Sequence, residues 1–183
     1  SNFKVSTISS YSAYFDHSVI ITEEGLIFGI GLNENHEIVK SLPHNVIGEY
    51  TKFDLRNAKR RKLHPISAFC GSDFTLYMVS MSENSGEKVT LASTFYDIKT
   101  VSPLFLNIGN KTPIAIYGGF LNSAAINNDG SLTFIPSSME TNSTSEFKTT
   151  HLPSNEAAVC LSVCASYIFA VDLRGRLFKS KIP

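Results

Sequence analysis

The sequence has no tryptophan, only three cysteines, and charged residues at only 17% of its 183 positions. An odd number of cysteines (Cys70, Cys160 and Cys164) argues against a disulfide framework and favours a reducing compartment, the cytoplasm or nucleus. No stretch approaches the roughly 20 uninterrupted apolar residues of a membrane-spanning helix. The first ten residues lack the charged and apolar regions of a signal peptide. We therefore expect a cytoplasmic or nuclear protein without membrane contact.

The chain also has no excess of charge of either sign, because 16 basic residues balance 16 acidic ones. A chain with zero net charge has no overall field to attract nucleic acid, so such binding is expected only through a local patch. Apolar residues reach 43%, which excludes a disordered tail and predicts a globular domain over residues 1–183.

One short pattern occurs four times: an alternating apolar run, a turn that contains glycine, and a second apolar run. We expect hairpin units near 8–31, 66–94, 114–135 and 159–179. Residues Glu24-Gly25 and Asp129-Gly130 supply the glycine that a tight hairpin turn with positive φ needs. No convincing amphipathic helix of three turns is present.

The spacing within the copies tests their alignment. His17 precedes Gly25 by eight residues, and the same offset separates Asn122 from Gly130 and Tyr167 from Gly175. The second copy has twelve residues between Phe74 and Gly86, which predicts a four-residue insertion in its turn. A period near 50 residues suits a four-stranded propeller blade. The predicted fold class is therefore all-β, with about four β-propeller blades of four antiparallel strands.

These copies resemble the repeats of the regulator of chromosome condensation family. The best matches are Gly118-Gly119 with Asn122 and Asp129-Gly130, and the run from His17 through Glu24-Gly25 to the tail Asn33-Glu-Asn-His-Glu-Ile38. The resemblance implies a propeller of seven blades and a structural role for His17 near an inner strand. It also implies two possible functions, guanine nucleotide exchange on a small GTPase, or a scaffold or substrate-binding segment of a larger ubiquitin-related protein.

The blade count leaves two architectures open. Propellers close with about four to eight blades, and 183 residues hold fewer than four units of this period. An open arc would leave unpaired strand edges at both ends. Either the chain belongs to a longer propeller that supplies the missing blades, or two chains meet as a homodimer to complete a ring.

The strongest charged feature is the run between Lys52 and His64. It can serve as a nuclear import signal, as a patch for phosphate or an acidic protein surface, or simply as a solvated loop. The candidate partner-binding residues are Arg56, Lys59, Arg60, Arg61 and Lys62.

Catalytic and metal-binding patterns are not found. The five histidines show no ligand spacing, so neither a metal nor another cofactor is expected. Cys164 aligns with Gly119 and Gly71, which predicts a buried, inert thiol. Glu23, Glu24 and Asp172 fall in hairpin turns, where we expect solvated carboxylates. The sequence thus favours a non-enzymatic module that presents blade loops to a protein partner.

Overall fold

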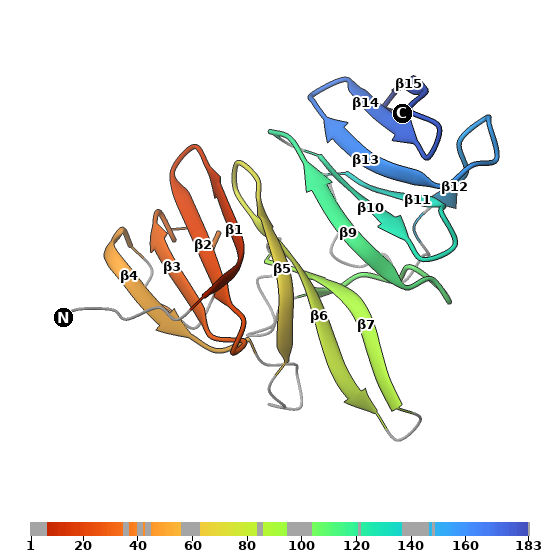
Figure 1. Cartoon of the computed structure of the whole chain (residues 1–183). Coiled ribbons are helices and arrows are strands. Elements are labelled where there is room, and N and C mark those ends of the chain that lie inside the picture. Colours follow the sequence, from red (N-terminus) through yellow and green to blue (C-terminus); the bar gives the residue numbers. More distant parts are fainter. Residues whose placement is uncertain are drawn as a thin grey trace.

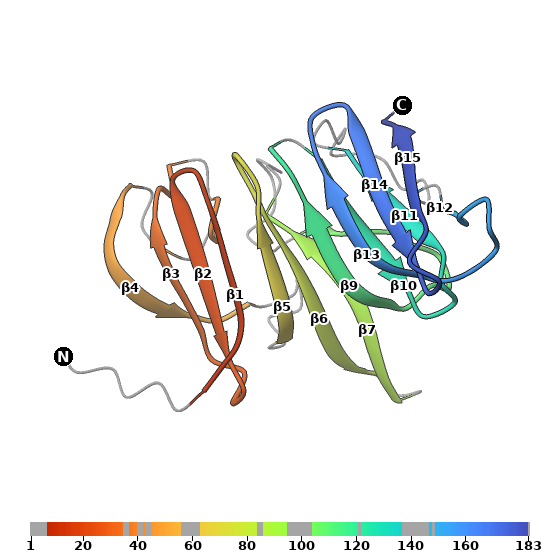
Figure 2. The same ribbon diagram turned by 45° about the horizontal axis from the view of Figure 1, so that its top comes forward.

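The computed structural model describes residues 7–34, 37–39, 42, 45–55, 63–83, 86–94, 104–120, 122–136, 147 and 149–182. These residues contain fifteen strands and no helix, arranged in four antiparallel sheets. The predicted fold class is confirmed. Figures 1 and 2 show the sheets side by side as successive sectors of an open arc.

The first two sheets each contain four strands in chain order. The first sheet consists of β1 (Ile8–Tyr14), β2 (His17–Thr22), β3 (Ile27–Gly31) and β4 (Ile47–Phe53). The second consists of β5 (His64–Cys70), β6 (Thr75–Glu83), β7 (Gly86–Ser93) and β8 (Leu104–Phe105).

The last two sheets repeat this order, although the fourth has three strands among the described residues. The third sheet consists of β9 (Pro113–Gly118), β10 (Ser123–Asn127), β11 (Leu132–Ile135) and β12 (Thr149–Thr150). The fourth consists of β13 (Ala158–Val163), β14 (Tyr167–Asp172) and β15 (Leu177–Lys181). The opening strands β1, β5, β9 and β13 contact one another in succession, so each sheet packs on the next.

Three turns between second and third strands share one hydrogen-bonded geometry. The N–H groups of Gly25, Gly130 and Gly175 donate to the carbonyl three residues earlier at 2.8, 2.9 and 2.9 Å. The three glycines have φ values of 73°, 78° and 75°, a region that residues with a Cβ rarely adopt. The positive φ predicted for Gly25 and Gly130 is confirmed, and Gly175 has it as well.

The prediction of a longer turn in the second copy is wrong. The pairing of β6 with β7 continues to Glu83 opposite Gly86, so only two residues separate the paired strands. The four additional residues lengthen the hairpin instead, because alternating residues such as Met81 and Lys88 extend the ladder of backbone hydrogen bonds.

The apolar core lies in three layers, one between each pair of successive sheets. Val19, Ile21 and Ile27 of the first sheet pack with Tyr77 and Val79 of the second. A second cluster joins Leu76 and Met78 to Ala125 and Ile135 of the third sheet, and a third joins Ala124 and Ile126 to Leu161 and Ala170 of the fourth. In the part of the chain that the structure describes, no helix is long and apolar enough to cross a membrane.

Candidate functional site

The turns between first and second strands lie on the same side of all four sheets (Figure 2). Three of these turns leave four residues between the closest strand pairs, whereas the β1–β2 turn has only Phe15 and Asp16. This side of the molecule carries the most exposed aromatic side chain of the described residues, Phe15, which is 89% exposed. We call this side of the four sheets the rim. Loops on a rigid β scaffold are common binding surfaces, so the rim is the first candidate site.

We define the aromatic patch as Tyr14, Phe15 and Phe120. The rings of Tyr14 and Phe120 lie 6.3 Å apart between centroids, although they come from the first and third sheets. The backbone N–H of Ser72 donates to the carbonyl of Phe120 at 2.9 Å, which fixes the third-sheet turn against the second sheet. The backbone of Phe15 has a φ of 45°, an unusual conformation for a bulky residue.

An open depression of about 340 Å³ lies beside the patch, lined by residues 13–18 with Ile30 and Gly31. The N–H of Leu32 donates to the carbonyl of Asp16, one of the lining residues, at 2.8 Å. The only ionisable groups among the lining residues are Asp16, Tyr14 and His17. The depression therefore offers an aromatic wall, one carboxylate and backbone groups.

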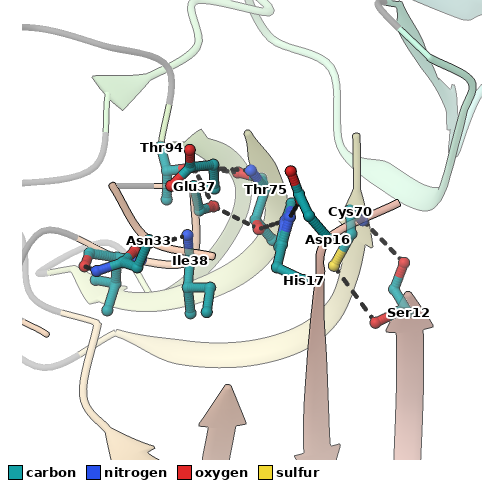
Figure 3. A network of polar contacts seen from close by, with 10 residues as sticks. Ser12, Asp16, His17, Asn33, Glu37, Ile38, Cys70, Thr75 and Thr94 are labelled. Atoms are coloured by element: carbon teal, nitrogen blue, oxygen red, sulfur yellow. Dashed lines mark hydrogen bonds and ion pairs between the residues drawn. The ribbon is translucent and has the colours of Figure 1, made fainter. Parts of the chain in front are cut away.

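His17 lies at this site but is fixed inside the protein (Figure 3). Its side chain is fully buried, with Nδ1 3.0 Å from a carboxylate oxygen of Asp16 and Nε2 3.0 Å from the hydroxyl of Thr75. The hydroxyls of Thr75 and Thr94 donate to the carbonyl of Glu37 at 2.7 and 2.8 Å. His17 thus links the first sheet to the second, which is the structural role that the resemblance implied.

The tail that follows β3 closes this network (Figure 3). The side-chain oxygen of Asn33 accepts from the N–H groups of Ile38 and Val39 at 3.0 and 3.2 Å, and its amide donates to the carbonyl of Val39 at 3.1 Å. The Tyr77 hydroxyl then donates to the carbonyl of Ile38 at 2.8 Å. The tail that follows β3 is therefore hydrogen-bonded to the second sheet.

The predicted partner-binding residues Arg56, Lys59, Arg60, Arg61 and Lys62 lie outside the described residues. Their flanking residues are described: Leu55 and Leu63 are 0% and 1% exposed, and the N–H of Leu63 donates to the carbonyl of Leu55 at 2.9 Å. Because the strands of the first sheet alternate in direction, β4 ends on the side opposite the β1–β2 turn. The described residues on either side of the basic segment, Leu55 and Leu63, therefore lie on the side opposite the aromatic patch.

The thiols differ sharply in environment. Cys70 is buried, and burial raises its pKa to about 11 although a hydrogen bond with Ser12 opposes the shift. Cys164 is exposed, so the prediction of a buried thiol is wrong. Its alignment holds, because the N–H groups of Cys164, Gly119 and Gly71 donate to the carbonyl three residues later in the same way. Cys164 differs because no further sheet covers that face among the described residues.

The prediction for Asp172 is also wrong. Its side chain is fully buried, and one carboxylate oxygen accepts from the N–H groups of Arg174 and Arg176 at 3.0 and 2.9 Å. Burial favours the neutral acid, but these bonds and the Arg176 guanidinium at 2.8 Å together hold the pKa of Asp172 below its ordinary value. Asp172 is a turn cap rather than a solvated surface acid.

No group of three or more His, Cys, Asp or Glu could hold a metal ion in the part of the chain with described positions. His36 and His44 lie outside that part. Sequence reasoning missed the aromatic patch. The sequence analysis placed the turn of this unit at Glu24-Gly25, whereas the structure adds a turn at Phe15 and Asp16, a kind of position that ordinarily carries polar residues or glycine.

No protein-family model matches the chain, and no curated protein matches it. Solved structures do match. Human WBSCR16 has a TM-score of 0.70 at 11% identity over 96% of this chain and 49% of its own. Yeast RCC1 (Prp20), solved bound to Kap60, has a TM-score of 0.66 at 14% identity over 99% of this chain and 45% of its own. Prp20p from Saccharomyces cerevisiae has also been described with its binding to Gsp1p and histones.

A shorter structure matches as well. The computationally designed protein Ika4 has a TM-score of 0.53 at 11% identity, over 97% of this chain and 92% of its own. The chain thus spans about half the length of WBSCR16 and yeast RCC1, but nearly all of Ika4. At these identities the matches show the propeller fold, which the four sheets display directly.

Proposed function

We propose that this chain is a non-enzymatic protein-interaction module whose aromatic patch binds a protein partner. The observation that carries the proposal is the exposure of Phe15, 89%, together with Phe120, 42%, on a rim where a backbone hydrogen bond joins the turn of Phe120 to the second sheet. Exposed aromatic side chains on a rigid base suit an interface, because burying them on binding costs little conformational entropy. The adjoining depression offers room for a partner side chain.

The fold matches are consistent with this proposal. Yeast RCC1 was solved bound to Kap60 and described with its binding to Gsp1p and histones, so this fold serves protein binding in that protein. The repeat resemblance adds guanine nucleotide exchange on a small GTPase as a second candidate. That candidate predicts faster release of a fluorescent guanine nucleotide from a loaded GTPase when the chain is added.

The interaction proposal is tested by affinity capture from lysate with quantitative mass spectrometry. The variants Phe15→Ser and Phe120→Ser remove the exposed rings, and truncating a central aromatic anchor typically weakens an interface by about 2 kcal/mol or more. Ile114→Ser is the matched control, since Ile114 is 57% exposed at the start of β9, the end remote from the rim. We expect the two rim variants to lose partners that the control retains. Equal recovery by all three variants would remove the patch as the binding site.

A further inference from the structure

The outer face of the fourth sheet has the residues of an inter-sheet interface. In the first three sheets, the second and third strands pair one apolar residue on each: Ile21 with Ile27, Met78 with Leu91, and Ile126 with Leu132. The third-strand members of these pairs are 2%, 0% and 7% exposed, because the next sheet covers them. Both members of each pair belong to the core layer between their own sheet and the next.

The fourth sheet repeats this pair without the cover. Val171 pairs with Leu177 in the same register, but Leu177 is 68% exposed. Phe169 takes the position of Val19, Leu76 and Ala124, which are at most 1% exposed, yet it is only partly buried. The ammonium of Lys179 lies 3.9 Å from the ring centroid of Tyr167 on this face. We call Tyr167, Phe169, Val171 and Leu177 the outer face.

The first sheet has the opposite side of such an interface. Ala68 pairs with Tyr77 and Leu161 pairs with Ala170, and the preceding sheet buries Ala68 and Leu161 to 8% and 5% exposure. Tyr11 pairs with Ile20 in the same register, but it is 59% exposed. We call Tyr11, Ala13 and Ile20 the entry face. One chain therefore carries both halves of the interface that its own sheets form three times.

We propose that the outer face binds the entry face of a second copy of this chain, and that the reciprocal contact closes two arcs into one ring. The second copy is favoured because it supplies the complementary face in the orientation that the internal interfaces use.

The test is the mass of the chain in solution, measured by light scattering. We expect the mass of two chains for the natural sequence. Leu177→Asp on the outer face and Tyr11→Asp on the entry face should each reduce it to the mass of one chain. Ile114→Asp, an exposed site in the third sheet and remote from both faces, should leave the dimer intact. Circular dichroism confirms that each variant keeps its sheet structure.

Two results would overturn the proposal. If the natural chain has the mass of one chain in solution, a second copy does not cover the outer face, and another occupant, such as further sheets, must do so. A dimer that Leu177→Asp dissociates but Tyr11→Asp does not would show that two outer faces pack on each other. Neither result tests the aromatic patch as a binding site, because Tyr14, Phe15 and Phe120 belong to neither face.

Discussion

The imidazole Nε2 of His17 lies 3.0 Å from the hydroxyl oxygen of Thr75, so a buried side chain of the first sheet is hydrogen-bonded to the second. Asp16 holds the other ring nitrogen at 3.0 Å. His17→Ala removes both contacts and leaves a buried space beside polar groups. We expect the free energy of unfolding to fall by about 1–3 kcal/mol, which urea denaturation measures.

His151→Ala is the control for this variant, because His151 is exposed. It should leave the denaturation midpoint unchanged. If His17→Ala were as stable as the control, the link between the sheets would contribute nothing.

Gly119 lies against the backbone of the fourth sheet. A Cβ at this position would overlap the carbonyl oxygen of Val163, whereas a Cβ at Gly48 would meet no atom within 4 Å. Gly119→Ala should therefore destabilise the protein by about 1–3 kcal/mol, since overlap with backbone forces the sheets apart. Thermal unfolding of Gly119→Ala beside Gly48→Ala measures the difference. Equal melting temperatures would contradict the close approach of the third and fourth sheets.

Burial of the Cys70 thiol makes stability depend on pH in the alkaline range. Its pKa rises from an ordinary 9.0 to about 11, so the unfolded chain loses this proton first as the pH rises. The stabilisation is complete below pH 9 and disappears as the pH passes 11, a change of up to about 3 kcal/mol. Urea denaturation at pH 8 and pH 11 should show a smaller loss for Cys70→Ser than for the natural chain. An identical loss would mean that Cys70 ionises equally in both states.

Phe15 has an exposed side chain on a backbone that disfavours it, with a φ of 45°. Asparagine tolerates this conformation better than phenylalanine, so Phe15→Asn should stabilise the fold by about 1 kcal/mol while reducing partner binding. Ile114→Asn, at an exposed site without positive φ, should give no such gain. Chemical denaturation of both variants decides the point, and a less stable Phe15→Asn would show that the ring contributes to the fold.

The repeat could be predicted from sequence because its signals are local. A turn glycine such as Gly130 and the apolar run of the strand before it are signals carried by neighbouring residues, because they depend only on φ and on local strand preference. Even in the second copy, where the insertion was placed in the turn, both strands were expected in the right order. The error arose because sequence spacing cannot separate a longer turn from a longer hairpin.

The candidate site was harder to predict because it depends on contacts between sheets. Tyr14 and Phe120 are more than 100 residues apart in sequence, and their rings meet only because two turns lie on the same rim. The basic run between Arg56 and Lys62 stood out in the sequence by composition alone, and it remains a prediction.

The sequence by itself determined that this protein is built from repeated hairpins, because strand alternation and turn glycines are properties of neighbouring residues. Only the tertiary structure decided which repeated positions are covered. Leu91 and Leu177 occupy the same place in their sheets, but the third sheet buries one and no described residue covers the other. Burial is decided by residues distant in the chain, and for the same reason Cys164 is exposed, against expectation. Asp172 is inside, also against expectation, where N–H groups of its own turn bind its carboxylate.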